Sequence, residues 1–518
     1  MSTTLSSPAA PRHLARLRHA AGAPWRALAQ LPATAQIVTA LVVATVVARS
    51  PGLVFNGIFD RDEAYLAVTG DVVRDGGRLY VDVIDRKPPL VPMVYAAVRD
   101  LSVDMRAARL ACALAVLANA VLVALLVRRL CGRTSAAVAA GVLAVLGTAW
   151  FLPADAQAAN FELWGLAPAT GAILAVVIAR TAPRHAWRWF ALAGALVAVA
   201  ASVKQPYIVV ALPVGWEALR AGRQRVAELG AAAVGVVAVL VSFASVVDLR
   251  DLWRWVWADN GDYLDGGIST GRALGIGLGL TVVFLCFHLP LLYGFWAAVT
   301  RRVRLDGTVL VWTVASLAVV PIGLRFFGHY YQQLVPPLAV LTGVALATAP
   351  RWAWRIVGAT AAITTLVLVS LSFALRPDLT NFTALGRYVQ ATTDPQDRIL
   401  VWGAIPDVYV SAQRLPTGVF LHHGYLTGNW ASRSTALSSD VVTGAPYRDR
   451  WKLFLDALAE DPPELVIDGA RQGTDWAAYP PSRYPIGAVL ERCYDPAARV
   501  DGLQVWRRDH QACPTPSR

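Results

Sequence analysis

The heptapeptide "FDRDEAY", from Phe59 to Tyr65, places three carboxylates and an arginine in four consecutive positions. Asp60 and Glu63 have the spacing of a helix capping box, in which both side chains accept hydrogen bonds from amides of the first turn. Asp62 would lie in that first turn, where the cap does not need its carboxylate. A carboxylate in this position could accept a proton, so the sequence predicts Asp62 as a general base.

The elements that position this peptide are predicted from the composition of the chain. Hydrophobic residues make up 56% of the 518 residues and charged residues only 16%, which is too apolar for a soluble chain of this length. A bilayer core of about 30 Å needs about 20 apolar residues per helix, and the sequence contains about eleven such runs. These runs cover roughly residues 33–49, 107–127, 135–151, 163–180, 188–203, 206–220, 229–247, 273–299, 307–324, 332–349 and 354–375.

Arginines gather in alternate connections between these runs, and the connections between them contain few basic residues. Cytoplasmic loops of membrane proteins are enriched in lysine and arginine. This pattern predicts a cytoplasmic N-terminal arm over residues 1–32, a first extracytoplasmic loop over 50–106 and an extracytoplasmic tail over 376–518. The formal net charge of +12 is explained by this topology, so we expect no nucleic-acid partner.

The tail contains short β-like runs, "RILVWG", "PELVIDG" and "LQVW", separated by turn-rich stretches with proline and glycine. These runs predict a small α/β domain. Cys493 and Cys513 both lie in it, and outside the cytoplasm they could form a disulfide or remain free thiols. The predicted fold class is therefore mainly α: a polytopic helical bundle over 33–375 with a C-terminal α/β domain.

The loop after the first span resembles a known family. An acidic pair followed by tyrosine precedes "G-x-x-Y-x-D" and "D-x-K-P-P-L", a pattern similar to the polytopic glycosyltransferases of the GT-C superfamily. The similar branch contains the protein O-mannosyltransferases and the aminoarabinose transferase of lipid A. The segments "NFELWG", "VKQP" and "RFFGHYYQQLVPPLA" also resemble this family. The motif residues here are Asp62, Glu63, Tyr65, Gly77, Tyr80, Asp82, Asp85, Lys87, Pro88, Pro89 and Leu90.

The resemblance implies an enzyme that moves a sugar, of the mannose or pentose class, from a polyprenyl-phosphate donor to a hydroxyl of a cell-envelope glycan, lipid or protein. It also implies inversion at the anomeric carbon. The predicted catalytic residues are Asp62, as general base, together with Glu63 and Asp60. The departing phosphate needs cationic stabilisation, and the acceptor hydroxyl needs a base on the opposite face of the sugar. We expect a multi-pass protein of a bacterial plasma membrane, with its active site outside the cytoplasm.

Two lysines are the strongest candidates to bind the donor phosphate. Of the 47 basic residues, only Lys87, Lys204 and Lys452 are lysines, and the first two lie at predicted outer membrane boundaries. A lysine retained in such an arginine-rich chain suggests a compact charge for a phosphate, although snorkelling at the interface explains either one alone. Arg325 and His329 lie on the same side and could complete the pocket, but for His329 a hydrogen-bonding role at the interface, among aromatic belt residues, is favoured over a direct catalytic one.

Further substrate contacts are predicted on the same outer side. The acidic and aromatic members belong to the motifs above, and Glu162 can also be explained as an acid at a helix N-terminus. The carboxylates of the heptapeptide could hold Mg²⁺ or Mn²⁺, but the resemblance does not decide this and no cofactor is assigned. The predicted substrate-binding residues are Tyr65, Tyr80, Asp85, Glu162, Gln205 and Tyr330.

Two other classes of protein share these general features. A transporter or flippase of lipid-linked sugars would also be polytopic and basic, but it would place ionisable residues near the bilayer midplane. The predicted spans are largely free of charge, which favours an enzyme at the membrane surface. A noncatalytic cell-envelope assembly protein is the other alternative, and the intact acidic cluster argues against it.

Overall fold

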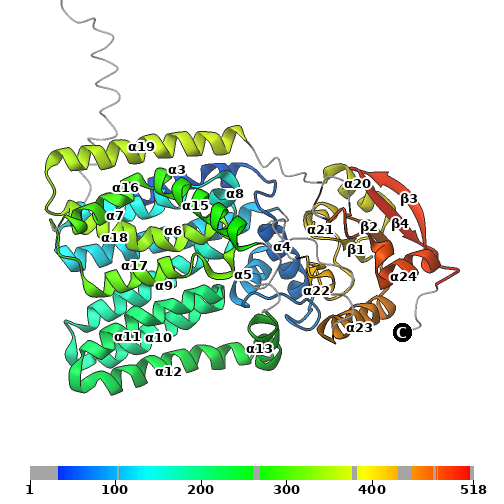
Figure 1. The fold of residues 1–518 in the computed structure, drawn as a ribbon, viewed down its shortest axis with the longest axis horizontal. Helices are drawn as coiled ribbons and strands as arrows, with labels where there is room; N and C mark the ends of the chain where they lie inside the picture. The colour runs from blue at the N-terminus through cyan, green and yellow to red at the C-terminus, as the bar shows by residue number, and fades with distance from the viewer. Residues whose placement is uncertain are drawn as a thin grey trace, which may run out of the picture.

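The computed structural model describes residues 33–101, 104–260, 269–300, 302–375, 382–429, 445–470, 474 and 476–513. The chain forms a bundle of helices and a separate C-terminal domain, which lie at opposite ends of the molecule in Figure 1. Two short helices lie between them: α4 (Arg61–Arg74) and α5 (Leu90–Val98). The acidic heptapeptide begins α4, so it lies where the two parts of the molecule meet.

Apolar helices make up the bundle. Seven described helices are long and apolar enough to cross a membrane, and many of their large hydrophobic side chains are exposed on the outside of the bundle. These helices are α3 (Ala33–Val54), α6 (Arg106–Cys131), α9 (Phe161–Ala179), α10 (Ala186–Val203), α12 (Arg225–Ala244), α15 (Thr270–Phe287) and α19 (Arg351–Ala374). Shorter helices complete the bundle: α7 (Thr134–Gly147), α11 (Ala211–Arg220), α16 (Leu289–Val299), α17 (Gly307–Ala318) and α18 (Val335–Leu346). The predicted fold class, a mainly helical polytopic membrane protein, is confirmed.

The expected count of about eleven spans is not confirmed, because several apolar runs do not form single helices. The run 273–299 divides into α15 and α16 at His288, and Pro290 lies in the first turn of α16. The run 206–220 begins with a 3₁₀-helix, η2 (Gln205–Val210), before α11 starts. Proline is favoured in the first turn of a helix and disfavoured inside one. Pro206 and Pro290 therefore mark the start of a new helix within continuous apolar sequence.

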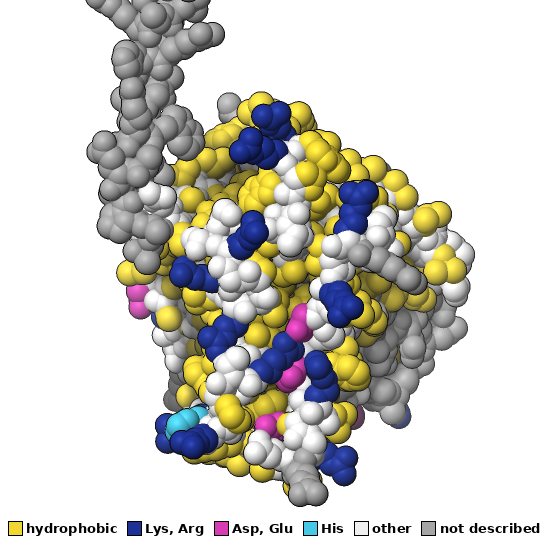
Figure 2. All heavy atoms as spheres, turned by 90° about the vertical axis from the view of Figure 1, so that its left-hand side faces the viewer, with side chains coloured by type: hydrophobic (Ala, Val, Ile, Leu, Met, Phe, Trp, Pro, Cys, Tyr) yellow, Lys and Arg dark blue, Asp and Glu magenta, His cyan; other side chains and the backbone are white. Residues whose placement is uncertain are grey.

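Basic side chains are spread over the end of the bundle that lies away from the C-terminal domain, where they outnumber the acidic ones (Figure 2). Arg180, at the end of α9, forms ion pairs with Glu217 of α11 and with Asp306 before α17, at 2.7 and 2.5 Å. These pairs hold three connections of the bundle together on one side. Exposed arginines in these and neighbouring connections are Arg128, Arg129, Arg133, Arg184, Arg188, Arg220, Arg225, Arg302, Arg304, Arg351 and Arg355.

The C-terminal domain contains a four-stranded sheet in the order β1-β2-β4-β3. Strands β1 (Ile399–Trp402) and β2 (Leu465–Asp468) are parallel, whereas β4 (Leu503–Arg508) pairs antiparallel with β2 and with β3 (Tyr494–Val500). The three β-like runs of the sequence are β1, β2 and β4. Strand β3 was not predicted because Pro496 interrupts its pattern; it lies beside a register shift on this edge strand, where proline is tolerated.

Helices surround this sheet, and a disulfide closes its end. The helices are α20 (Thr383–Thr392), α21 (Asp407–Ala412), α22 (Gly424–Thr427), α23 (Ala445–Glu460) and α24 (Pro485–Cys493). Cys493 and Cys513, for which the sequence left two states open, are joined with their Cα atoms 5.3 Å apart. The bond ties the segment after β4 to the end of α24.

The C-terminal domain shares a hydrophobic core with the elements between it and the bundle. Trp255, in the short amphipathic helix α13 (Leu249–Val256), packs edge-on against Phe420 and Tyr425 of the domain, with ring centroids 5.9 and 6.0 Å apart. The amide of Ile84 donates a hydrogen bond of 2.8 Å to the carbonyl oxygen of Val419. These contacts fix the position of the C-terminal domain relative to the loop that precedes α5.

Candidate active site

A cavity of about 970 Å³ lies between the bundle and the C-terminal domain. Its walls come from the start of α4, the loop before α5, the junction of α10 with η2, the 3₁₀-helix η6 (Gly328–Leu334) and loops of the C-terminal domain. The cavity collects most of the predicted site residues, although they are spread over more than half of the chain. The predicted residues that line it are Asp60, Asp62, Tyr65, Asp85, Lys87, Glu162, Lys204, Gln205, His329 and Tyr330.

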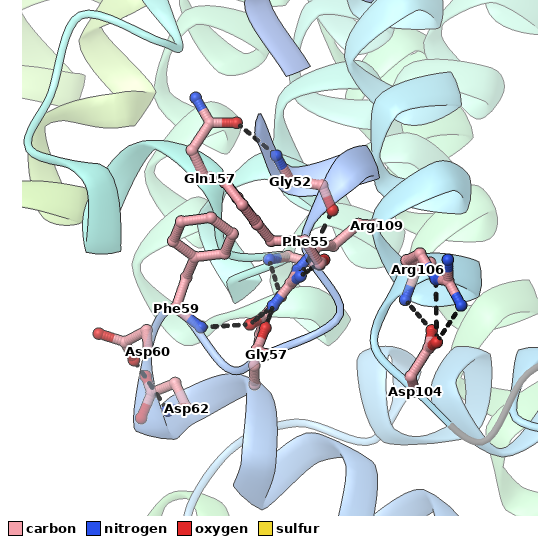
Figure 3. Close-up of polar contacts among 12 residues, drawn as sticks. Gly52, Phe55, Gly57, Phe59, Asp60, Asp62, Asp104, Arg106, Arg109 and Gln157 are labelled. Carbon is pink, nitrogen blue, oxygen red and sulfur yellow. Dashed lines mark hydrogen bonds and ion pairs between the residues drawn. The ribbon is translucent and has the colours of Figure 1, made fainter. Parts of the chain in front are cut away.

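The first turn of α4 positions the two aspartates. Asp60 is the N-cap residue, and its carboxylate accepts a hydrogen bond of 2.8 Å from the amide of Asp62. Figure 3 shows the side chains of Asp60 and Asp62 together, to one side of Arg109. The predicted cap is therefore present on the Asp60 side, and the carboxylate of Asp62 takes no part in it.

Glu63, predicted as a catalytic acid, does not line the cavity. Its side chain is fully buried and forms two hydrogen bonds, of 2.7 and 2.6 Å, with the guanidinium of Arg109. It also accepts hydrogen bonds from the amides of Phe59 and Ala159, at 3.1 and 2.9 Å. All of these contacts are internal to the protein. We therefore correct the prediction: Glu63 anchors the start of α4, and the cavity receives the aspartates that flank it.

Asp62 forms an ion pair with Lys87, with 2.8 Å between Oδ2 and Nζ. Burial opposes ionisation of Asp62, but the charges of Lys87, His329 and Lys204 outweigh it and hold the pKa of this carboxyl well below its usual range. Lys87 is only 9% exposed, and its Nζ lies 4.1 Å from the centroid of the Phe161 ring. The cavity thus contains a carboxylate and an ammonium that are both charged and poorly hydrated.

A second ion pair lies on the same side of the cavity. Lys204 pairs with Glu162 at the start of α9, and its Nζ lies 4.3 Å from the centroid of the Tyr330 ring. His329 donates from Nδ1 to Asp155 at 2.8 Å, and its Nε2 lies 3.9 Å from Glu162. Burial lowers the pKa of His329, but these two carboxylates outweigh it and raise the pKa to about 9. His329 is therefore a cation at neutral pH.

Two other predicted residues do not line the cavity. Tyr80 is buried in the left-handed region at φ 67°, and its hydroxyl donates to the carbonyl oxygen of Lys87 at 2.9 Å. Arg325 is 1% exposed and lies between Leu324 and Phe326, which both have positive φ. These positive φ angles turn the backbone, and the Arg325 side chain lies in the protein interior. The sequence pattern does not predict this turn. Tyr80 supports the lysine loop, and neither side chain is placed to contact a substrate.

Gln205 and Tyr65 line the cavity and also join its parts. The side chain amide of Gln205 donates to the carbonyl oxygens of Arg86 and Val256, at 2.7 and 3.2 Å. The ring of Tyr65 stacks on His422 of the C-terminal domain, with centroids 5.7 Å apart.

The sequence left open whether the acidic cluster holds a metal ion. Among the described residues, no group of three or more acidic, histidine or cysteine side chains is arranged to hold one.

The structure adds cavity residues that sequence reasoning missed. Arg61 and Arg86 lie within the quoted motifs, but the abundance of arginine concealed them. The C-terminal domain contributes His422, Tyr425 and Trp476. These residues lie in turn-rich sequence with no periodicity, so the sequence carried no signal for them.

Comparisons with known proteins agree with this architecture. Residues 86–247 match a family model described as dolichyl-phosphate-mannose-protein mannosyltransferase. The structure of ArnT from Cupriavidus metallidurans bound to undecaprenyl phosphate is similar, with a TM-score of 0.63 and 13% identity over 92% of this chain and 98% of that chain. Its apo state gives the same TM-score with 15% identity, over 94% of this chain and all of the other.

A more distant relative has the same arrangement. The archaeal oligosaccharyltransferase AglB from Archaeoglobus fulgidus, in complex with an inhibitory peptide and a dolichol-phosphate, gives a TM-score of 0.51 with 11% identity over 93% of this chain and 75% of that chain. No curated protein sequence matches the chain significantly. The chain therefore has the fold of these solved structures, most similar in TM-score to the two ArnT states. The family model covers residues 86–247, less than half of the chain, and it agrees with the family resemblance noted in the sequence.

Proposed function

We propose that the protein transfers a sugar, of the mannose or pentose class, from a polyprenyl-phosphate donor to a hydroxyl of a cell-envelope acceptor. The observation that carries the proposal is that Lys87, Lys204, Asp60 and Asp62 line one cavity at the end of the membrane bundle. Buried cations suit a phosphate, and a carboxylate beside them suits a proton transfer. The similar ArnT structure that holds undecaprenyl phosphate supports a donor of this class.

The reaction follows from these charges. The acceptor oxygen attacks the anomeric carbon on the face opposite the phosphate, and the bond from that carbon to the phosphate oxygen breaks. Asp62 takes the proton of the acceptor hydroxyl as the new bond forms. The phosphate leaves as an anion that Lys87 and Lys204 stabilise, so no acid is needed to protonate it. One displacement of this kind inverts the anomeric configuration.

The ion pair between Asp62 and Lys87 couples donor binding to the strength of the base. The Lys87 ammonium lies 2.8 Å from Asp62 and helps to lower the pKa of that carboxyl. A donor phosphate would compete for the same ammonium and add a negative charge near Asp62. Both effects favour protonation of Asp62, so the carboxylate becomes a stronger base once the donor is bound.

The position of the cavity supports an extracytoplasmic site. It lies beside the C-terminal domain, and the arginine-covered end of the bundle lies away from that domain (Figures 1 and 2). Since basic loops favour the cytoplasmic side, the cavity and the domain would face the outside of a plasma membrane. An acceptor of the cell envelope could reach it there.

Purified protein in detergent or nanodiscs should consume one member of a panel of mannosyl and pentosyl polyprenyl phosphates. Lys87→Met should lower kcat/KM for that donor about 100-fold or more, because a buried cation facing the leaving phosphate is lost. Lys452→Met is the matched control, since this lysine is 77% exposed and pairs with Asp456 one turn away on the same helix. If the wild-type protein consumes no donor in the panel, or both variants retain full activity, the proposal is wrong.

Donor affinity should depend on pH through Asp60. Burial and the neighbouring Asp62 raise the pKa of Asp60 to about 7, so Asp60 gains a negative charge as the pH rises from 6 to 8. The phosphodiester of the donor keeps one charge over this range, and His329 stays protonated because its pKa is raised to about 9. We therefore expect donor affinity to fall about tenfold. Asp60→Asn keeps the helix cap and should remove this dependence; an unchanged pH profile would contradict the assignment.

A further inference from the structure

The carboxyl ends of two parallel strands of the C-terminal domain lie beside the cavity. Strands β1 and β2 are parallel and paired from Ile399–Leu465 to Trp402–Asp468, so their carboxyl ends lie side by side. The residues that follow these ends, Ala404 and Ile405 after β1 and Gly469 after β2, line the cavity. In α/β sheets, ligands bind outside the carboxyl ends of parallel strands. The same placement here suggests that the domain takes part in binding.

A glycine follows each of these two strands. Gly403 follows β1 with φ at +118°, a conformation that residues with a side chain rarely adopt. A Cβ atom on Gly469 would come within 2.3 Å of the carbonyl oxygen of Trp402, so no side chain fits there. At Gly469 the two strand ends therefore approach more closely than a residue with a side chain would allow.

Aromatic side chains also line the cavity. We define the aromatic wall as Tyr65, His422, Tyr425 and Trp476, which all line the cavity. His422 stacks on Tyr65, and its centroid lies 6.0 Å from that of Trp476. Trp476 in turn packs edge-on against the buried Trp402, at 6.4 Å. The wall is thus supported from behind by the domain core.

The wall is uncharged. Nδ1 of His422 accepts a hydrogen bond of 2.9 Å from the amide of Gly424, so a neutral ring carries its proton on Nε2. Burial and the nearby Arg86 lower the pKa of His422 well below its usual range, which keeps the ring neutral. The described C-terminal residues that line the cavity carry no charge; they are Ala404, Ile405, Leu421, His422, Tyr425, Gly469, Thr474 and Trp476.

We propose that the aromatic wall is a subsite for a neutral sugar ring, whose apolar face packs on Trp476 and His422. The inference rests on the proposed function and adds a role for the C-terminal domain. The membrane side of the cavity is charged and the domain side is aromatic, which matches a substrate with a phosphate at one end and a sugar ring at the other. Aromatic faces bind apolar surface at low entropic cost, and an imidazole N–H can bond a hydroxyl. The ring could belong to the donor or to a glycan acceptor.

Two binding measurements separate these sources. Affinities of the full-length protein in nanodiscs are measured for bare undecaprenyl phosphate and for the sugar-loaded carrier consumed in the donor panel. If the wall binds the donor sugar, Trp476→Leu should weaken binding of the loaded carrier about tenfold and leave the bare carrier unchanged. If it binds the acceptor, both carrier affinities should stay the same and the KM for the acceptor should rise about tenfold.

Controls keep the test specific to the wall. Trp476→Phe retains a ring and should recover most of the affinity, and His422→Gln retains an amide donor. Trp506→Leu is the matched control, because Trp506 lies on β4 of the same sheet and does not line the cavity. Unchanged affinities and acceptor KM in folded Trp476→Leu would overturn the inference. Failure of the wild-type protein to bind the bare carrier would instead refute the proposed function, on which the inference rests.

Discussion

Asp62→Asn is expected to lower the rate of sugar transfer by about 10²–10⁴-fold, the usual contribution of a positioned general base. Asparagine has nearly the same shape, so the first turn of α4 should persist, and the N-cap bond from the Asp62 amide to Asp60 involves only the backbone of residue 62. The variant also frees the Lys87 ammonium from its 2.8 Å ion pair. Donor binding should therefore be unchanged or tighter while turnover falls. Single-turnover kinetics and equilibrium binding of the carrier measure the two effects separately.

The control for this variant is Asp82→Asn. Asp82 belongs to the same loop region, but it pairs with Arg78 on the surface, with 41% of its side chain exposed. Removal of an exposed ion pair of this kind changes stability by less than about 1 kcal/mol, and transfer should continue at the wild-type rate. If folded Asp62→Asn protein turned over donor at a near-normal rate, Asp62 would be only a partner of Lys87, and another group would have to act as base.

The site residues that lie in continuous sequence motifs, on one side of the membrane, could be predicted. Lys87 and Lys204 stood out because lysine is rare in this chain, and both line the cavity. The hydrophobic runs predicted the bundle because a bilayer demands long apolar helices. The rare lysines and the hydrophobic runs can each be recognised within a short stretch of sequence, so they could be predicted without the folded structure.

The parts that could not be predicted depend on contacts between distant segments. The β-like runs of the tail predicted strands, but they gave no indication that β1 and β2 would direct their carboxyl ends toward the cavity. Glu63 belongs to the same heptapeptide as Asp62, yet its partner Arg109 lies on α6. Residue type and spacing made Glu63 look like a catalytic acid, whereas burial makes it an anchor.

Glu63→Gln is accordingly expected to destabilise the protein by about 3–5 kcal/mol, because it leaves the Arg109 guanidinium buried without its counter-ion. The carboxylate of Glu63 accepts four hydrogen bonds, two from Arg109 and one each from the amides of Phe59 and Ala159. Arg109 also donates to the carbonyl oxygens of Phe55 and Gly57 (Figure 3). The pair therefore joins the end of α3 and the start of α4 to α6 and to the segment before α9. Unfolding in mixed micelles should show the loss of stability.

The pair formed by Asp104 and Arg106 provides the matched comparison. It lies close to the Arg109 cluster (Figure 3), but the Arg106 side chain is 54% exposed and that of Asp104 is 19% exposed, whereas both members of the Glu63 pair are buried. Asp104→Asn should therefore change stability by less than about 1 kcal/mol, because its partner remains solvated. Glu63→Gln combined with Arg109→Met removes both buried charges and should be less destabilising than Glu63→Gln alone. If Glu63→Gln unfolded like the wild-type protein but lost transfer activity, Glu63 would have a catalytic role after all.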